Sequence, residues 1–480
     1  MDESLKYYLE NTVVTKSAIE SRLSHPITKI RYPKRLVYGL LKKFADDFFN
    51  AGTEPRFVSM AGLRGVGKTT LLWQTANHIY TNHHKEIYFF NVNTLKNLGI
   101  DLHIALEEFQ RHIIKKRFNE LSEPITFLFD EVHDDDNWSK TLKILYDEAR
   151  TAIILCTGSS ALLLNSTADL SRRMHTLKVL PFSFSELLLA KKALSPEKQI
   201  LIPDASISAE LKQILFFSEN ADDVIESLNR IGERIYPVLN QKDVEISELQ
   251  RQYIDFLNFP NLLFFDDEIV ITNAILDLFK RIINEDIPKL KPTFADFTKL
   301  ERLILRLAGS DEINPEKLAG IIGVKQNDIH ELIDILAKAE LLNVLIPFGG
   351  LDTKIAKNKK AFFMSPSLRR ALLSTFYGQD LPDQFRSKLI EDIIVMYLRR
   401  VLTDGIISFV SGKNVANPDF VIETRDKPVL LEIGTSKTST RQIKQSNVSY
   451  RYGLLVSNGV TGLSLKGDCI QIPLSWFLLL

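Results

Sequence analysis

The stretch AGLRGVGKTTLL (residues 61–72) stands between an apolar run and a run of helix-forming residues. It fits the pattern G-x-x-x-x-G-K-[ST], with an expected strand before it and an expected helix after it. Glycines in such a loop let backbone N–H groups converge on phosphate oxygens, and the helix that begins there adds the positive end of its dipole. The stretch therefore predicts a loop that binds the phosphates of a nucleoside triphosphate. The alternative is a glycine-rich turn that matches the pattern by chance.

The polar residues of this loop have separate expected roles. Lys68 is expected to reach the β and γ phosphates, and Thr69 is expected to hold Mg²⁺. We expect the loop to contact the nucleotide through Gly62, Gly65, Gly67, Lys68, Thr69 and Thr70.

A pair of acids follows another apolar run of this region, ITFLFDEVH (residues 125–133). Asp130 ends the expected strand and is predicted to orient the Mg²⁺ shell together with Thr69, while its neighbour Glu131 is predicted to polarise the attacking water as the catalytic base. Acids that begin a helix are the alternative interpretation. Lys68 and Glu131 are the two residues of this region that we expect to be catalytic.

Two further polar groups follow along the chain. The run AIILCTGSS (residues 152–160) ends in a polar cluster, which faces the ligand crevice if the sheet is parallel. Ser159 is then placed to contact the γ-phosphate or to position water, and a Ser/Gly turn that caps a helix is an equal alternative. Downstream, Arg172 and Arg173 form a pair from which an arginine can stabilise transition-state charge.

Length and charge bound the remaining possibilities. The chain has 480 residues, 45% of them hydrophobic and 25% charged, and its formal net charge is +0. A chain of this length predicts two to four domains. The neutral balance excludes the globally basic character that is typical of nucleic-acid-binding proteins, so any such binding needs a local patch.

The cysteines and the amino-terminal residues bear on the compartment. The chain has only two cysteines, Cys156 and Cys469. This number is too small for a disulfide framework or a zinc site, so both are excluded. The chain starts without the basic-then-apolar order of a signal peptide, and no run approaches 18 apolar residues. We therefore expect a cytoplasmic protein without a membrane partner.

The pattern of apolar residues changes several times along the chain. From 56 to 184 short β-rich runs alternate with helical ones, which predicts a parallel sheet with helices on both faces. Helices take over from 186 to about 290. Three helical runs and two β-rich runs between 296 and 370 resemble a winged helix, and the helix and β-rich runs after 385 predict a second α/β domain.

The third helix of this winged-helix pattern is VKQNDIHELIDILAKAE (residues 324–340). A helix that enters the DNA major groove needs basic or amide side chains on its exposed face. The positions outside the apolar stripe here include Asp328, Glu331 and Asp334, the opposite of what phosphate neutralisation requires. We expect this helix to pack against protein, whereas the wing that follows has the charge to grip a DNA backbone. Its lysines are Lys354, Lys357, Lys359 and Lys360.

The order of these motifs resembles that of the AAA-type ATPases of bacteria and archaea, in the archaeal-ATPase-like group. The matching features are GLRGVGKTTLL, FLFDEVH, the following Trp138, CTGSSALLL, an arginine eight residues before PFSFSE, and the winged-helix pattern. The resemblance implies ATP and Mg²⁺ as cofactors and a helical lid after the core. It also implies Arg173 as a catalytic arginine, acting in cis or in trans. Members of the group often carry a C-terminal domain related to the PD-(D/E)xK nucleases.

Nucleases of that kind hold Mg²⁺ with an Asp and a Glu on adjacent strands and use a lysine two residues after the Glu. Asp419 in PDFVIET and Glu432 in PVLLEIG match the two metal-binding acids. Glu391 on the preceding helix matches the family's helical carboxylate. We therefore expect these three acids to be catalytic if the domain is active.

The lysine position departs from the family pattern because it holds Gly434. Lys437 is the first candidate to replace that lysine, and Lys444 on the following helix is the second. Residues 433–467 also contain five basic residues and no acid, as a nucleic-acid-binding face would require. The alternative is a degenerate fold that is kept for packing.

These observations predict an α/β protein with a P-loop, AAA-type parallel-sheet core, a helical lid, a winged helix and a C-terminal domain like that of restriction endonucleases. The expected function is ATP binding and hydrolysis coupled to a nuclease-like domain that acts on DNA, with a defence role suggested by family analogy alone. The alternative is a nucleotide-dependent switch or scaffold with an inactive nuclease-like domain that binds a protein or nucleic acid.

Candidate partners, besides ATP, are DNA, further copies of the chain and an effector protein. The expected segments are residues 1–50 (N-terminal helices), 51–190 (ATPase core), 191–294 (helical lid), 295–378 (winged helix) and 379–480 (nuclease-like domain).

Overall fold

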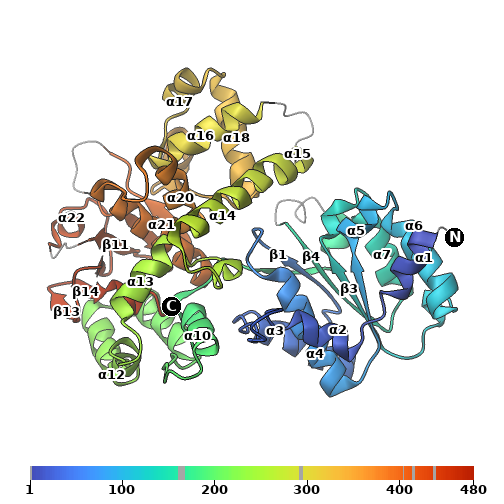
Figure 1. Cartoon of the computed structure of the whole chain (residues 1–480). Helices are drawn as coiled ribbons and strands as arrows, with labels where there is room; N and C mark the ends of the chain where they lie inside the picture. The colour runs from blue at the N-terminus through green and yellow to red at the C-terminus, as the bar shows by residue number, and fades with distance from the viewer. Residues whose placement is uncertain (1–2, 160–167, 291–295, 404, 413–416, 436–438) are drawn as a thin grey trace. The chain divides into compact units, whose positions relative to one another are not determined.

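The computed structural model describes residues 3–159, 168–290, 296–403, 405–412, 417–435 and 439–480. The chain divides into two compact units, residues 1–180 and 181–480 (Figure 1). This division falls ten residues before the expected end of the ATPase core at 190. The three segments expected beyond that point, residues 191–294, 295–378 and 379–480, belong to one compact unit.

The first unit is built on a five-stranded parallel sheet in the order β2-β3-β4-β1-β5. Strand β3 is buried at all six positions, as expected for a parallel strand that helices cover on both faces. The parallel sheet predicted from the alternating pattern is thus confirmed. Its strands are β1 (Phe57–Ala61), β2 (Ile87–Asn91), β3 (Ile125–Asp130), β4 (Ala152–Gly158) and β5 (His175–Lys178).

Helices cover both faces of this sheet (Figure 1). The helices α2, α3 and α4 pack together on one face, and α1, α5, α6 and α7 lie on the other, where they enclose an aromatic core. The helices are α1 (Glu3–Glu10), α2 (Lys16–Arg22), α3 (Tyr38–Ala51), α4 (Lys68–His83), α5 (Val92–Asn97), α6 (Leu102–Phe109), α7 (Trp138–Glu148) and α9 (Ala168–Ser171).

The second unit contains a nine-stranded sheet in the order β13-β14-β12-β11-β10-β9-β7-β8-β6. The strands β7 and β8 form the antiparallel pair expected of the wing, and β7 also pairs in parallel with β9. The segments expected at 295–378 and 379–480 therefore share one sheet. The strands are β6 (Glu312–Ile313), β7 (Leu342–Pro347), β8 (Lys359–Phe363), β9 (Ile406–Phe409), β10 (Phe420–Glu423), β11 (Val429–Gly434), β12 (Gly453–Ser457), β13 (Ser464–Lys466) and β14 (Cys469–Pro473).

The shared sheet has a physical reason. A strand edge that is left open exposes unpaired N–H and C=O groups. The pairing of Ile346 with Ser408 and of Pro347 with Phe409 satisfies the ends of both β7 and β9 at once. Local sequence patterns carry no information about such a pairing.

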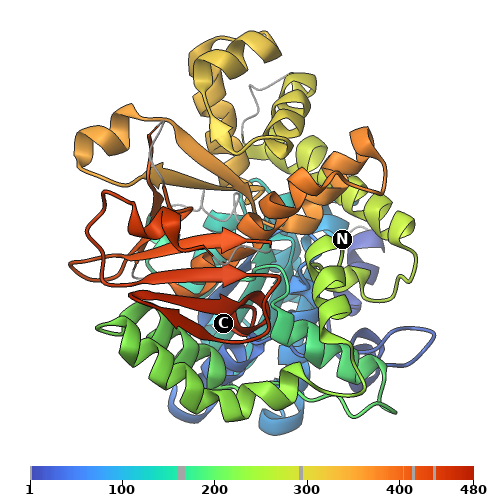
Figure 2. The ribbon, with the colours of Figure 1, turned by 90° about the vertical axis from the view of Figure 1, so that its left-hand side faces the viewer.

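The helices expected as a lid pack within the second unit. Helix α12 lies against β13 and β14 (Figure 2), and the hydroxyl of Tyr452 donates to the carbonyl of Leu215 at 3.1 Å. Arg451 donates to the carbonyls of Phe216 and Ser218 at 2.9 and 2.6 Å. Helix α10 (Phe184–Leu194) crosses the expected start of the lid at 191. The helices that follow it in the lid segment are α11 (Ile207–Phe217), α12 (Ala221–Leu239), α13 (Ile246–Asp255), α14 (Glu268–Arg281) and α15 (Ile287–Leu290).

Helix α21 is the central element of the second unit. It is buried around almost its whole circumference, as expected of a helix that is apolar on several faces, and it contacts both β8 and β11. Its Asp392 forms a fully buried ion pair with Arg369 at 2.7 Å. The remaining helices are α16 (Phe297–Ala308), α17 (Pro315–Ile322), α18 (Gln326–Lys338), α19 (Leu351–Ala356), α20 (Pro366–Tyr377), α21 (Arg386–Val401), α22 (Arg441–Lys444) and α23 (Leu474–Phe477).

Across the described parts of the chain, we find no helix with both the length and the apolar character that crossing a bilayer requires. Cys156 and Cys469 are both buried free thiols.

Candidate active site

The strand order of the first unit brings the predicted motifs to one edge of the sheet. Strand β4 lies between β1 and β3, and all three run in the same direction. The loop after β1, the acids after β3 and the polar residues after β4 therefore meet at the carboxyl edge of the sheet, where α/β proteins bind ligands.

The loop after β1 has the backbone that its glycines permit. Gly65 and Gly67 have φ angles of 81° and 90°, a region that side chains with a Cβ rarely adopt. At Gly62, an added Cβ would stand 2.3 Å from the carbonyl oxygen of Val179, so a larger residue cannot fit. Helix α4 begins directly after this loop, and the N–H groups of its first turn point toward the loop.

Lys68 is buried, and its ammonium lies within the loop. Its Nζ donates to the carbonyl oxygens of Gly62 and Leu63 at 2.9 and 3.0 Å. An ammonium has three N–H donors and a positive charge. The group that holds the loop together can therefore also bind a phosphate there. Thr70 follows in the first turn of α4 and is half-buried.

Thr69 and Asp130 meet as the sequence predicts. The Thr69 hydroxyl lies 3.0 Å from both carboxylate oxygens of Asp130, and the hydroxyl of Thr157 at the end of β4 donates to Asp130 at 2.6 Å. A hydroxyl and a carboxylate are hard oxygen donors of the kind that Mg²⁺ prefers. The donors present therefore fit the magnesium ion that the motifs imply.

Asp130 is 4% exposed, and its environment works against its charge. Burial raises its pKa to about 6, and the neighbouring charge of Glu131 adds to this effect. The hydroxyls of Thr157 and Thr69 and the charge of Lys68 oppose it. A divalent cation beside Asp130 favours the ionised carboxylate, because it supplies the positive charge that the buried site otherwise takes from hydrogen-bond donors.

Glu131 turns the chain sharply at the end of β3. Its φ angle of 56° is left-handed, a conformation that costs a non-glycine residue about 1 kcal/mol or more. The turn is held because the Glu131 N–H donates to Thr157 Oγ1 at 2.9 Å. Its carboxylate is partly exposed at the edge of the sheet, with Oε2 3.4 Å from Nδ1 of His133.

His133 and Arg35 are two residues at this edge that sequence reasoning missed. His133 is buried, and its Nδ1 lies 3.4 Å from the backbone nitrogen of Ser159, which is itself buried. His133 is part of the motif FLFDEVH, so its place shortly after the two acids could have indicated that it belongs to this site.

Arg35 braces the phosphate loop from the N-terminal segment. It is buried and donates to the carbonyl of Val66 inside the loop and to that of Leu180 at 2.7 Å. Gln74 of α4 donates to the carbonyls of Tyr32 and Pro33 at 3.3 and 3.1 Å. No pattern in the sequence connects this arginine with Val66, 31 residues later.

Arg173 lies at the opposite edge of the sheet. Strand β5 runs parallel to β1, with His175 beside Val58 and Lys178 beside Ala61, so Arg173 precedes the strand at its amino end. The five residues of β1 span about 16 Å. Arg173 donates instead to Asp147 at 2.9 Å, away from the loop of its own chain.

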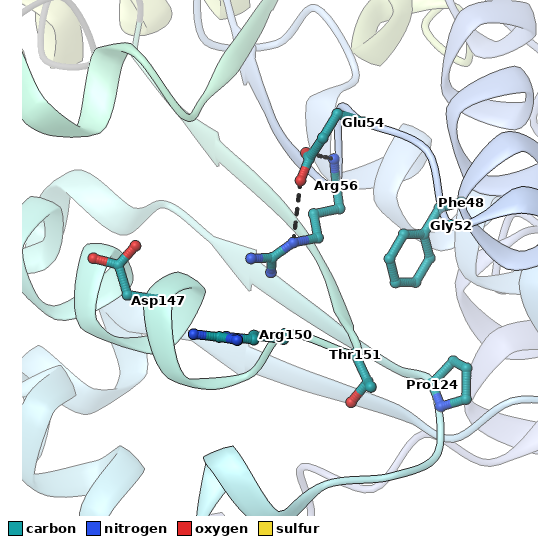
Figure 3. A pocket seen from close by; sticks show the side chains of 8 residues that line it. All are labelled: Phe48, Gly52, Glu54, Arg56, Pro124, Asp147, Arg150 and Thr151. Carbon is teal, nitrogen blue, oxygen red and sulfur yellow. Dashed lines mark hydrogen bonds and ion pairs between the residues drawn. The ribbon is translucent and has the colours of Figure 1, made fainter.

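A cavity of about 650 Å³ opens at this same amino edge of the sheet (Figure 3). Its lining includes Arg56, Asp147 and Arg150, and Glu54 pairs with Arg56 at 3.3 Å. This cavity is therefore separate from the predicted phosphate site.

The three predicted acids of the second unit come together. The carboxylate of Asp419 accepts the N–H of Ile433 at 2.7 Å, which places it beside Glu432 in β11. Burial raises the pKa of Glu391 to about 8, and the charges of Asp311 and Asp419 add to it. Glu391 on α21 thus lies within electrostatic reach of Asp419.

The position at which a lysine is expected beside these acids holds Gly434. Gly434 ends β11, and Lys437 lies outside the described residues. The ammonium of Lys444 lies close to Gly467, in the turn between β13 and β14. Lys388 and Lys360 are the cations that oppose the raised pKa of Glu391, and the sequence did not single out either for this role.

Comparison with protein families finds a match that includes the whole sheet of the first unit. Residues 54–188 match the family described as AAA domain. This matched segment is similar to AAA domains and is called the AAA domain below. The AAA domain includes the phosphate loop, the acids after β3 and Arg173. A second match, over residues 258–378, is to a domain of unknown function, DUF8612.

Two relatives of the chain are uncharacterized proteins. One, from Methanocaldococcus jannaschii, is 27% identical over 99% of this chain and 94% of its own length. The other, from Haemophilus influenzae, is 23% identical over 65% of this chain and 68% of its own length. Both relatives therefore extend well beyond the AAA domain.

The chain also has weak similarity to solved structures. The Aeropyrum pernix ORC2 protein is 13% identical, with a TM-score of 0.38 over 80% of this chain and 98% of that one. The RuvB Holliday junction branch migration motor of Thermotoga maritima is 14% identical, with a TM-score of 0.28 over 68% of this chain and 93% of that one.

Proposed function

We propose that the AAA domain binds ATP with Mg²⁺ and hydrolyses it. The observation that carries this proposal is the contact of Thr69 and Thr157 with Asp130 beside the glycine loop, which gathers oxygen donors for a metal ion where the loop would hold phosphates. Lys68 neutralises phosphate charge, and Glu131, at the exposed edge, orients and deprotonates the attacking water. Bound Mg²⁺ would draw charge from the transferred phosphoryl group.

Titration of the purified chain with labelled ATP and Mg²⁺ tests this proposal. We expect saturable binding that Lys68→Ala abolishes, because the variant loses the ammonium of the loop. Lys6→Ala removes an exposed lysine on α1 and should leave binding intact. Absence of saturable binding to the unmodified chain would reject the nucleotide site.

Arg173 is proposed to act on the ATP of a second copy of the chain. Its place at the amino edge of the sheet favours action in trans over action in cis, because the length of β1, about 16 Å, lies between that edge and the loop of its own chain. An arginine supplied by a neighbour stabilises transition-state charge. Hydrolysis then requires a homo-oligomer.

The C-terminal part of the second unit is proposed to be a nuclease-like domain of the PD-(D/E)xK type that acts on DNA. Support comes from helix α21 followed by the antiparallel strands β9, β10 and β11 and the parallel strand β12, with Glu391, Asp419 and Glu432 on adjoining elements. Clustered carboxylates of this kind can hold Mg²⁺. ATP turnover would control this domain.

A second candidate function is a nucleotide-operated switch without nuclease chemistry. It is favoured by Gly434 at the lysine position and by contacts of the wing. Lys354 pairs with Glu423 at 3.8 Å, and Lys357 donates to the carbonyl of Ser411 at 3.4 Å. These lysines are engaged with the neighbouring strands, and the exposed face of α18 is acidic.

A plasmid assay distinguishes the two functions. The chain is incubated with plasmid, ATP and Mg²⁺ or Mn²⁺, next to Asp419→Ala and Glu432→Ala. Cutting that both variants lose supports the nuclease, whereas intact ATP turnover without cutting supports the switch. Asp426→Ala, which removes an exposed acid between β10 and β11, is the matched control and should behave as the unmodified chain does.

A further inference from the structure

Two histidines and an aspartate form a cluster on α3 and α4, apart from the sites described above. Asp46 on α3 places Oδ1 2.6 Å from Nε2 of His78 and 2.8 Å from Nε2 of His83, both on α4. One potential ligand atom from each residue lies within 4.8 Å of the others. Three donors thus converge from two helices onto one point.

The rings are already held in place. His83 stacks on Phe49, with ring centroids 4.8 Å apart, and meets the ring of His78 edge-on at 5.6 Å. The side chains of His78 and His83 are 8% and 10% exposed, whereas that of Asp46 is 31% exposed. The imidazoles are therefore fixed in the interior, and the carboxylate leaves an access path from solvent.

We propose that Asp46, His78 and His83 bind a divalent transition-metal ion of the zinc type. Two imidazole nitrogens and one carboxylate oxygen form a ligand set that suits zinc, and a water molecule would complete a tetrahedral shell. Mg²⁺ prefers an octahedral shell of oxygens, so the magnesium of the ATP site is a poor competitor here.

Binding requires only small adjustments of the cluster. With metal–ligand bonds of about 2.1 Å, tetrahedral ligands stand about 3.4 Å apart, so the partly exposed carboxylate has to withdraw slightly from the two nitrogens. Each neutral imidazole also has to carry its hydrogen on Nδ1, so that the lone pair of Nε2 faces the ion.

Asn82 is the neighbour that this change of tautomer affects. Its amide nitrogen lies 3.0 Å from Nδ1 of His78 and 2.9 Å from the carbonyl oxygen of the same residue. Asn82 is exposed, so its amide can turn and present the oxygen to the Nδ1–H of a metal-bound His78.

The position of the cluster determines what the ion would do. Helix α4 has 16 residues and is therefore about 24 Å long, with Lys68 at its start and His83 at its end. An ion at the far end takes no part in phosphate chemistry. It would clamp the end of the helix that carries the phosphate loop to α3, and so stabilise the AAA domain.

The presence of only two cysteines predicts that the chain has no zinc site. That exclusion holds for sites built on cysteine. The ligands here are histidines and a carboxylate, and Asp46 lies 32 residues before His78, so no short spacing motif announces them.

Zinc binding by the full chain tests the proposal. After treatment with a chelator and desalting, the chain is titrated with Zn²⁺, and bound metal is measured by elemental analysis and thermal unfolding. We expect one ion per chain and a higher Tm, with both effects lost or the affinity lowered at least about tenfold in Asp46→Asn and His83→Asn.

The adjacent His84 supplies a matched control. It is exposed, with a φ angle of 52° that asparagine also tolerates, so His84→Asn removes a nearby imidazole without touching the cluster. This variant should bind zinc as the unmodified chain does. Binding of ATP by each variant shows that the AAA domain is folded, which separates failure at this site from failure of the ATP site.

Co²⁺ provides a measurement that does not depend on variants. If the unmodified chain takes up one Co²⁺ with the visible absorption of a tetrahedral nitrogen and oxygen site, the proposal is supported. If the unmodified chain retains neither ion, or if both variants retain zinc equally well, the proposal is overturned.

Discussion

The two carboxylate clusters of this protein, one at the end of β3 and one beside β11, have opposite surroundings. Asp130 accepts hydrogen bonds from two threonine hydroxyls and lies near the charge of Lys68, and burial raises its pKa only to about 6. Burial raises the pKa of Glu391 to about 8, and further acids add to it more than Lys388 and Lys360 oppose it.

The difference is that hydrogen-bond donors of the protein surround Asp130, whereas a bound cation would have to balance the charge of the second cluster. The AAA domain supplies hydroxyls, an ammonium and backbone N–H groups that lie near its acids in space. The second cluster gathers acids from a helix, a strand and the residue before another strand. Burial, with repulsion among the acids adding to it, keeps a proton on the cluster near neutral pH. A bound divalent cation would remove that proton, so we expect metal to matter more for the charge state of the second cluster.

The largest expected effect concerns Arg173, the predicted catalytic residue of the AAA domain that lies at the amino edge of the sheet, away from Asp130 and Glu131. Arg173→Ala should lower ATP turnover by about 10³-fold or more while ATP still binds, because an arginine that stabilises phosphoryl-transfer charge contributes that much. Steady-state hydrolysis and ATP titration measure the two quantities.

Mixing Arg173→Ala with Glu131→Gln tests whether the arginine acts in trans. Each variant supplies what the other lacks, so mixed oligomers should regain turnover. Mixed oligomers without any regained turnover would contradict action in trans.

Glu131→Gln should have the next largest effect. The variant keeps the shape of the side chain but loses the base, so turnover should fall by about 10²- to 10⁴-fold with ATP affinity preserved. Hydrolysis and binding are measured on the same preparation. Retained turnover would show that a group other than Glu131 accepts the proton of the attacking water.

Glu391→Gln tests the second cluster through pH. The folded-state pKa of about 8 lies above the ordinary value of 4.5, so the folded state binds more protons than the unfolded state between these values. The stability of the unmodified chain should therefore fall as pH rises from 4.5 to 8. Thermal unfolding without divalent metal should show a smaller fall in the variant, and an unchanged fall would contradict the raised pKa.

Thr157→Val has the smallest expected effect and sharpens the contrast at Asp130. The substitution removes a buried hydroxyl that donates to Asp130 and accepts from the N–H of Glu131. We expect about 1.5 to 3 kcal/mol lower stability from the lost charge-assisted hydrogen bond. Affinity for Mg²⁺-ATP should also weaken more at pH 6 than at pH 8, because the pKa of Asp130 rises further.

Denaturant unfolding and ATP titration at both pH values measure these changes. Thr151→Val removes a half-buried hydroxyl at the other edge of the sheet and serves as the control. Equal effects of the two substitutions would show that the hydroxyl at Asp130 has no special electrostatic role.

The sequence by itself determined the parts of this protein that depend on short-range geometry. The glycines of residues 61–72 permit the turn that the backbone makes, and the β-rich runs between 56 and 184 specify the five parallel strands of the AAA domain. The approach of Thr69 and Asp130 followed from the same patterns, because carboxyl ends of parallel strands share an edge.

Only the tertiary structure decided which distant segments meet. The pairing of β7 with β9, the grip of Arg35 on the phosphate loop and the convergence of Asp46 on two histidines join residues that are at least 31 positions apart. Burial of edges and packing of side chains select these contacts after the local elements have formed. For the same reason the amino-edge position of Arg173 became evident only from the register of β5 against β1.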